Sequence, residues 1–95
     1  MTKAAFDRPW AVVIKNSAKA DLRKLRDSGL RQRFEKLVAT LRQDPYRPSD
    51  YFKKLEPSSA GRYSRRINYQ HRLVYRIDHA TRTVTILAAW SHYEA

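Results

Sequence analysis

The last third of the chain contains three strand-like runs that follow one another with only short links between them. They span Arg62–Asn68, His71–Ile77 and Thr83–Trp90, and a turn around residues 78–80 joins the second to the third. Consecutive strands with short connections pair most readily as an antiparallel meander. The sequence therefore predicts that an antiparallel sheet forms the centre of this fold.

A strand and a helix are predicted near the start of the chain. The run "WAVVIK", Trp10–Lys15, is rich in strand-forming residues and follows Pro9. Ser17 is a suitable N-cap for a helix, because its side-chain oxygen can accept a hydrogen bond from the first turn. That helix is predicted to end at Ser28-Gly29, since glycine readily adopts the left-handed conformation that stops a helix.

A second helix is predicted from about Leu30 to Asp44-Pro45, because the residue before a proline avoids helical angles. Its apolar residues recur at helical spacing and form one stripe: Leu30, Phe34, Leu37, Val38 and Leu41. The link between the two helices is short, so they are expected to pack as an antiparallel pair. A helix-turn-helix DNA-binding module is a weaker alternative, because the apolar stripe is expected to face a sheet.

The order β-α-α-β-β-β gives an α+β fold in which an α-helical hairpin packs on one face of an antiparallel β-sheet. We expect a single domain over residues 10–95, preceded by a flexible extension over residues 1–9. The proline-rich stretch between the second helix and the meander is predicted as loop. Inside it, "YFKKL" is interpreted as either one short turn or one short strand.

Alternation along the strands places arginines on the side of the sheet that the helices leave uncovered. In the second run of the meander, Arg72 faces away from the apolar positions, which are His71, Leu73, Tyr75 and Ile77. If Ile67 points into the core, Arg66 lies on the same side as Arg72. Two interpretations remain open: a cradle for phosphate groups, or solvated charges that discourage edge pairing.

The charge balance predicts a polyanionic partner. Twenty Lys and Arg residues stand against nine Asp and Glu residues, which gives a formal charge of +11 and an isoelectric point near 10.5. Nucleic acid, an anionic membrane surface and an acidic protein all fit such a charge. No apolar run is long enough to span a bilayer, and no signal peptide is recognisable, so a cytoplasmic location is the simplest interpretation.

Metal and disulfide chemistry are not expected. The chain contains no cysteine, which excludes disulfides and cysteine-based metal sites. The three histidines are far apart and lack the spacing of a zinc site, so we assign no metal and no cofactor. His71 is predicted as a hydrogen-bonded core residue and His79 as a solvated turn residue, while Trp10 and Trp90 are expected to pack in the core.

The segment "YSRRINYQHRLVY", Tyr63–Tyr75, followed by a strand and "WSHYE", resembles the YoeB branch of the RelE-type toxins of bacterial toxin–antitoxin modules. The resemblance extends from about Trp10 to Glu94. It implies the fold described above and a metal-independent endoribonuclease that cuts messenger RNA in the ribosomal A site. In that chemistry, the ribose 2′-oxygen attacks the neighbouring phosphate and the 5′-oxygen leaves.

The resemblance also implies residue roles. His92 is matched to the general acid, and Tyr93 to a residue that shapes the site. Arg72 is matched to an arginine that grips the phosphate through two donors. The remaining expected RNA contacts are Arg65, Arg66, Lys54 and Tyr69. Taken from the local pattern alone, packing at the end of the last strand is the favoured interpretation of His92 and Tyr93.

One position departs from the YoeB pattern, which has a glutamate as general base where this chain has Lys53. Three interpretations are open. Glu56, the only carboxylate between Tyr51 and Asp78 in the sequence, takes over as the base; Lys53 and Lys54 act as lysines do in the RelE branch; or catalysis is weak or lost. In the last case the protein would bind the ribosome and the antitoxin without efficient cleavage.

The implied partners are messenger RNA, the ribosomal A site and an acidic cognate antitoxin of the YefM/Phd-like kind. That antitoxin is expected to cover the arginine-bearing face or the His92 end of the molecule, in keeping with the positive charge. Operator DNA is expected only through the antitoxin. A homodimer is a further expectation, and no membrane partner is expected.

Overall fold

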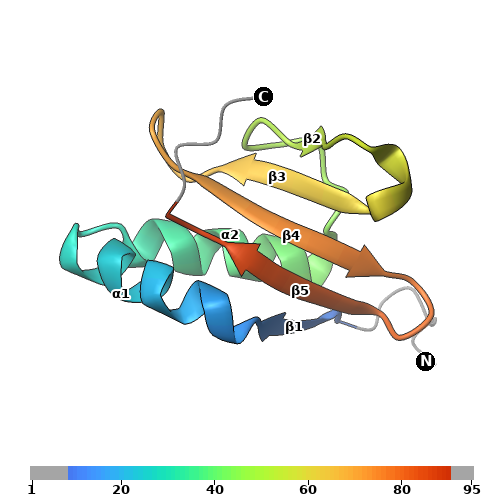
Figure 1. The fold of residues 1–95 in the computed structure, drawn as a ribbon, viewed down its shortest axis with the longest axis horizontal. Helices are drawn as coiled ribbons and strands as arrows, with labels where there is room; N and C mark the ends of the chain where they lie inside the picture. The colour runs from blue at the N-terminus through green and yellow to red at the C-terminus, as the bar shows by residue number, and fades with distance from the viewer. Residues whose placement is uncertain (1–8, 91–95) are drawn as a thin grey trace, which may run out of the picture.

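The computed structural model describes residues 9–90, and Figure 1 gives its ribbon. The strands are β1 (Ala11–Ile14), β2 (Lys53–Lys54), β3 (Arg62–Arg66), β4 (Arg72–Asp78) and β5 (Thr83–Ala88). The helices are α1 (Lys19–Asp27) and α2 (Arg31–Gln43), and short 3-10 turns lie at Asn16–Ala18 and Ser58–Ala60. The predicted elements are present in the predicted order. The segment "YFKKL" contains a strand, while residues 1–8 of the predicted extension lie outside the described residues.

The five strands form one sheet in the order β1-β5-β4-β3-β2. β3, β4 and β5 pair antiparallel, which confirms the predicted meander, and β2 adds to the outer edge of β3. β1 instead pairs in parallel with β5, so the sheet is mixed rather than wholly antiparallel. The helical hairpin explains this difference, because it carries the chain from β1 at one edge of the sheet to β2 at the other (Figure 1).

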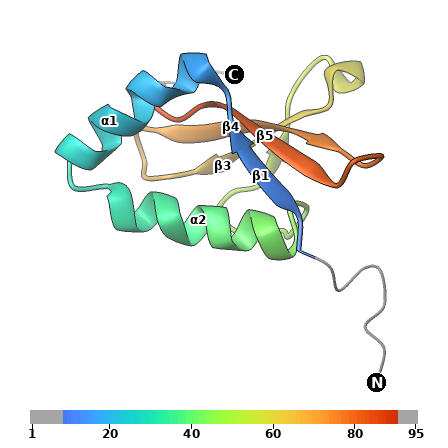
Figure 2. The same ribbon diagram turned by 90° about the horizontal axis from the view of Figure 1, so that it is seen from below.

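Both helices pack into one core with the sheet, and within residues 9–90 no further α-helix is present to cover the opposite face. Figure 2 shows the two helices and the strands from below. Their buried residues Leu25, Leu37 and Leu41 pack in one core with apolar residues of the strands. The chain turns between the helices at Gly29, whose φ of 75° lies in the left-handed region that glycine adopts freely. Ser17 is not the N-cap that the sequence predicts: it lies in a 3-10 turn, and α1 begins two residues later.

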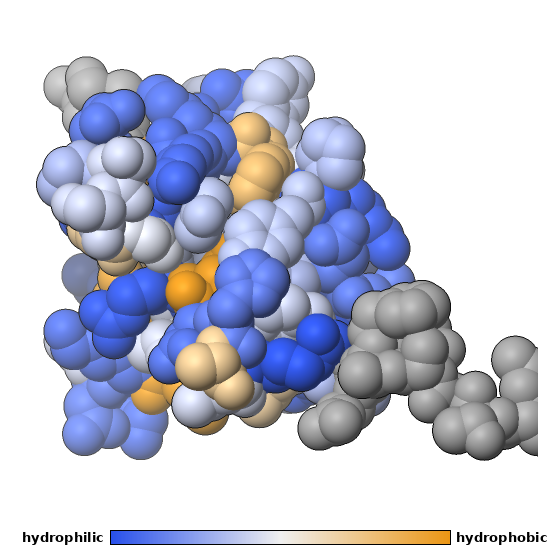
Figure 3. All heavy atoms as spheres, turned by 90° about the vertical axis from the view of Figure 1, so that its right-hand side faces the viewer, coloured by the Kyte–Doolittle hydropathy of each residue, from blue (hydrophilic) through white to orange (hydrophobic). Residues whose placement is uncertain are grey.

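Figure 3 views the end of the molecule that carries the β4–β5 turn, which lies at the right of Figure 1. Its surface is mostly hydrophilic and contains small apolar patches. Larger apolar side chains are exposed elsewhere at a few positions, which are Val13, Ile14, Tyr51 and Tyr69. Within residues 9–90, neither helix is long and apolar enough to cross a bilayer.

Candidate functional site

The strand register gathers polar side chains on the open face of the sheet. β3 lies between β4 and β2. Arg66 of β3 is directly opposite Arg72 of β4, and Ser64 of β3 is directly opposite Lys53 of β2. Residues that are opposite in a sheet, or two apart on one strand, share a face. Lys53, Ser64, Arg66 and Arg72 therefore form one group on the face away from the helices, which we call the cradle. The predicted placement of Arg66 beside Arg72 is confirmed.

Arg72 is oriented by a neighbour that the sequence did not single out. Its Nη1 atom donates a hydrogen bond of 3.2 Å to Oγ of Ser64, which is fully buried. A guanidinium group carries five N–H donors in a rigid plane, so one bond to a fixed hydroxyl sets its orientation and leaves further donors for an anion. The position of Ser64, two residues before Arg66 in "YSRR", was the signal that could have identified it.

Arg66 lies at the end of β3, where a loop packs beside it. The Cζ atom of Arg66 is 4.0 Å from the ring centroid of Tyr51, a cation–π contact. The backbone N–H of Arg66 donates to the carbonyl of Asp50 at 2.7 Å. Arg33 of α2 pairs with the Asp50 carboxylate at 3.0 Å and also donates to the carbonyls of Arg66 and Ile67. The loop is thus fixed to both the helix and the strand.

Arg65 belongs to the core rather than to the RNA contacts that the sequence suggested. Its side chain points to the helix side of the sheet and has no exposed surface. The guanidinium donates to the carbonyls of Ser49 at 2.8 Å and Pro45 at 3.0 Å, and lies 4.8 Å from the ring of Phe52. That expectation was wrong because Arg65 lies one position out of phase with Arg66, and a strand turns alternate residues to opposite faces.

The two lysines of β2 also point to opposite faces. Lys53 faces the cradle, whereas Lys54 pairs with Tyr63 and lies 5.8 Å from its ring on the other face. Glu56 follows β2 and is exposed, and its backbone carbonyl accepts a hydrogen bond of 2.8 Å from Arg62. Arg62 is four residues from Arg66, about 13 Å along the strand. Lys53 is therefore part of the cradle, and Glu56 is associated with the far end of β3.

The two residues that were expected to supply the acid, His92 and Tyr93, lie outside the described residues. The chain immediately before them is held firmly. The backbone N–H of Ala89 donates to the carboxylate of Asp21 at 3.1 Å. The ring of Trp90 stacks on His71, with 3.9 Å between centroids, and His71 is buried as predicted.

Two further predicted residues are exposed. Tyr69 in the β3–β4 turn is 89% exposed, so it is accessible to a ligand. His79 is exposed in its turn, as predicted, and it also stacks on Tyr46 with 5.3 Å between ring centroids. Within residues 9–90, no group of three or more His, Cys, Asp or Glu side chains is arranged to hold a metal ion.

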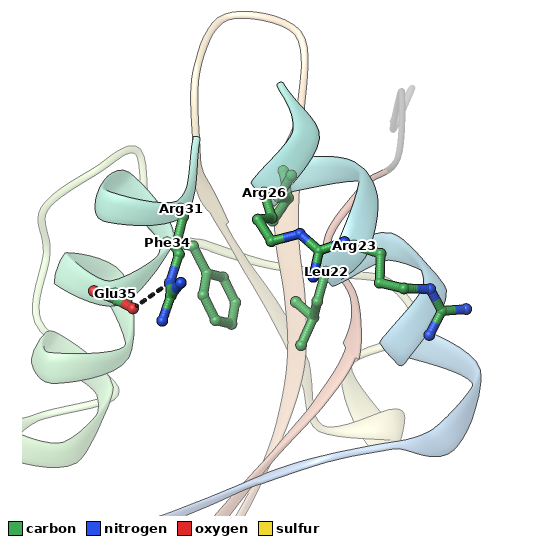
Figure 4. Close-up of a pocket in the computed structure, with 7 residues that line it drawn as sticks. Leu22, Arg23, Arg26, Arg31, Phe34 and Glu35 are labelled. Atoms are coloured by element: carbon green, nitrogen blue, oxygen red, sulfur yellow. Dashed lines mark hydrogen bonds and ion pairs between the residues drawn. The ribbon is translucent and has the colours of Figure 1, made fainter. Parts of the chain in front are cut away.

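A separate hollow lies on the helix side of the molecule, between α1 and α2 (Figure 4). Leu22 of α1 and Phe34 of α2 line it, with Arg23 and Arg26 on the α1 side. Across it, Arg31 and Glu35 form a hydrogen-bonded ion pair of 2.9 Å on one face of α2. Among residues 9–90, none of the predicted catalytic residues lines this hollow, which lies on the face of the sheet opposite the cradle.

Comparisons with known proteins agree on one family. A family model described as "YoeB-like toxin of bacterial type II toxin-antitoxin system" matches residues 18–93. Toxin YoeB of Synechocystis sp. is 35% identical over 68 residues, which cover 72% of this chain and 77% of that protein. A chain of the RelBE2 toxin–antitoxin complex from Mycobacterium tuberculosis is 34% identical with a TM-score of 0.70, covering 90% of this chain and 93% of that one. The YoeB dimer from Staphylococcus aureus is 25% identical with a TM-score of 0.75, covering 90% and 99%.

Proposed function

The chain belongs to the YoeB-like toxin family of bacterial type II toxin–antitoxin systems, and on that premise we propose that it is a ribosome-dependent endoribonuclease that cleaves messenger RNA in the A site. The reaction is attack of the ribose 2′-oxygen on the adjacent phosphorus, with departure of the 5′-oxygen. It leaves a 2′,3′-cyclic phosphate on one product and a free 5′-hydroxyl on the other. Such a reaction needs groups that hold the phosphate, a base for the 2′-proton and an acid for the leaving oxygen.

The observation that carries this proposal is the pairing of Arg66 with Arg72 on the open face of the sheet. Like charges directly opposite one another destabilise a sheet. A bound phosphate would convert that repulsion into attraction, because each guanidinium can donate two parallel hydrogen bonds to its oxygens. The bond from Arg72 to buried Ser64 holds one of the two forks in place before the ligand arrives.

In the proposed mechanism Arg72 holds the scissile phosphate and stabilises the extra negative charge of the transition state. Arg66 contacts the same phosphate or the next one along the strand. His92 donates a proton to the 5′-oxygen, a role that rests on the family resemblance.

We assign the role of the general base, which accepts the proton of the 2′-hydroxyl, to Lys53 rather than Glu56. The register of β2 turns Lys53 toward Ser64, the residue that orients Arg72. Glu56 is associated instead with Arg62, about 13 Å along β3 from Arg66. Lys54, which points to the other face, is expected to contribute charge without contacting the scissile phosphate.

The main test replaces Arg72 with alanine. The substitution Arg72→Ala is expected to lower the rate of messenger cleavage on programmed ribosomes by about 100-fold or more, because one preorganised donor group is lost. Primer extension on the messenger reads out the cleavage. Arg76→Ala is the matched control, since Arg76 lies on the same strand and face, opposite Arg62. Equal loss in both variants would indicate a general charge effect and would contradict the assigned role.

A second experiment separates the enzyme from a relative that binds ribosomes without cutting. The glutamate of the family pattern is replaced by Lys53, and this observation motivates the alternative. We expect Lys53→Ala to abolish cleavage and Glu56→Gln to retain it, with both variants still bound to ribosomes in a pelleting assay. Growth arrest and ribosome binding by the unmodified toxin without new RNA ends would support the binding alternative instead.

The proposed partners follow from the family and the charge. We propose that an acidic antitoxin covers the cradle, and that operator DNA is contacted only through it. The similar RelBE2 chain occurs in a toxin–antitoxin complex, which supports this partner. The similar YoeB dimer supports a homodimer of this chain. Messenger RNA and the ribosome place the action of the toxin in the cytoplasm.

A further inference from the structure

We propose that Tyr51 and Arg66 form a stacking shelf for one nucleobase of the RNA strand held in the cradle, an inference that rests on the proposed RNA-binding function. Neither the family pattern nor the strand alternation assigns Tyr51 a role. The shelf would take any base, with preference for a purine because of its larger face, and it would set the position of the nucleotide beside the bound phosphate.

Tyr51 is exposed to solvent and has an unfavourable backbone conformation. Its side chain is 67% exposed, so its large ring adds little to the core. Asp50 and Tyr51 have φ values of 56° and 57°, in the left-handed region that side chains with a Cβ atom disfavour. Two such residues in succession persist only where the surroundings hold them, and such strain is concentrated at functional positions.

The loop is held by contacts from three directions. Arg33 pairs with the Asp50 carboxylate at 3.0 Å, and the backbone N–H of Arg66 donates to the Asp50 carbonyl at 2.7 Å. From the core side, Arg65 donates to the carbonyl of Ser49 at 2.8 Å. The backbone that carries Tyr51 is therefore fixed before RNA arrives, which reduces the entropy lost on binding.

The shelf adjoins the proposed phosphate site. The Cζ atom of Arg66 lies 4.0 Å from the Tyr51 ring centroid, and Arg66 is directly opposite Arg72. Opposite residues of an antiparallel pair are about 5 Å apart at Cα, so the shelf lies next to the proposed phosphate ligand Arg72. A guanidinium on one face of the ring leaves the other face for a base, so that phosphate and base are bound by adjacent groups.

The test measures affinity rather than cleavage. The probes are a 2′-O-methyl oligoadenylate of about eight nucleotides and an abasic oligomer of the same length and charge. Tyr51→Ala is expected to lower affinity for the oligoadenylate about tenfold, and to change affinity for the abasic oligomer by less than about twofold, in fluorescence anisotropy at fixed salt. Unchanged oligoadenylate affinity, or equal loss with both oligomers, would overturn the proposal.

Two companion variants separate the ring from the loop. Tyr51→Phe retains the aromatic face and is expected to bind both oligomers as the unmodified protein does. Tyr51→Gly is expected to bind as weakly as Tyr51→Ala but to have a higher Tm, because glycine relieves the left-handed strain that alanine retains. If affinity followed Tm across the alanine and glycine variants, the role of Tyr51 would be structural.

Failure of the shelf proposal and failure of the cleavage proposal give different results. A toxin that shows the Tyr51 effect on oligoadenylate but leaves messengers uncut on ribosomes would refute the cleavage proposal alone. A toxin that cleaves messengers while Tyr51→Ala binds both oligomers normally would refute the shelf alone.

Discussion

Arg65 and Arg66 are neighbours in the sequence, yet they lie in the two most different environments of the sheet. Arg65 is fully buried on the helix side, where it holds the carbonyls of Pro45 and Ser49. Arg66 lies on the open side opposite another arginine, and its charge is balanced by no carboxylate ion pair among the described residues. An identical side chain thus stabilises the fold on one face and remains available to an anion on the other.

The largest expected effect is the loss of Arg65. Arg65→Ala should lower the free energy of unfolding by about 3 kcal/mol, because two carbonyls in the interior lose a charged donor. Urea denaturation measures it. The neighbouring change Arg66→Ala should lower stability by less than about 1 kcal/mol, since it removes only a surface cation–π contact. Similar losses in the two variants would contradict the proposed division between the faces.

The second prediction concerns the open face and keeps the charge constant. Arg72→Lys should lower the cleavage rate about tenfold or more while unfolding stays within about 1 kcal/mol of the unmodified protein. The lysine retains a positive charge but loses the planar fork that Ser64 orients. Single-turnover cleavage on programmed ribosomes measures the rate. Full activity of the lysine variant would mean that charge alone suffices at this position.

The third prediction uses pH to probe the buried face. Burial raises the pKa of Tyr75 above its usual value of 10.0, an effect that nearby Arg65 partly opposes. Above about pH 10 the unfolded chain therefore releases this proton while the folded protein keeps it, so stability should fall by up to about 1.4 kcal/mol per pH unit. Below that pH the contribution is fully present. Urea unfolding between about pH 9 and pH 11 tests this.

Tyr75→Phe provides the control for that titration. The phenylalanine cannot ionise, so the alkaline decline should become shallower, although the hydrogen bond to the Pro45 carbonyl is also lost. Tyr69→Phe, at the exposed β3–β4 turn, should leave the decline as it was. An unchanged alkaline slope in the Tyr75 variant would assign the decline to other groups.

The smallest expected effect concerns a charged residue that lies neither in the buried core nor on the open face of the sheet. Glu35 pairs with Arg31 on the exposed surface of α2 at 2.9 Å. Glu35→Ala should change the free energy of unfolding by less than about 0.5 kcal/mol and leave RNA cleavage unaffected. Thermal unfolding and the ribosome assay together measure this. A larger loss of stability would indicate that charge near the α1–α2 hollow matters more than exposure suggests.

Local patterns predicted much of this architecture. Short links between strand-like runs predicted the meander, the stripe from Leu30 to Leu41 predicted α2, and strict alternation placed Arg66 beside Arg72. These features depend on neighbours in the sequence, which is why they were accessible. The same alternation, applied one residue earlier, would have shown that Arg65 points into the core.

Other features depend on contacts between distant segments and left no local signal. The parallel pairing of β1 with β5 is set by where the helical hairpin delivers the chain. The left-handed backbone at Asp50 and Tyr51 could not be predicted, because neither residue is a glycine. It is held by an ion pair with Arg33 of α2, which is distant in the sequence. The order along "YFKKLE" left both Glu56 and Lys53 open as candidates for the base, and it did not reveal the strand register that places Lys53 opposite Ser64.

The pairing of β1 with β5 also bears on how such a toxin is synthesised. Among residues 9–90, β1 is the first strand and pairs only with β5, the last, with a register that joins Ala11 to Thr83. Contacts this distant in sequence form late, because a long loop must close first. A growing chain therefore lacks its completed sheet until β5 has left the ribosome, and the fold stays incomplete for as long as the chain is being translated.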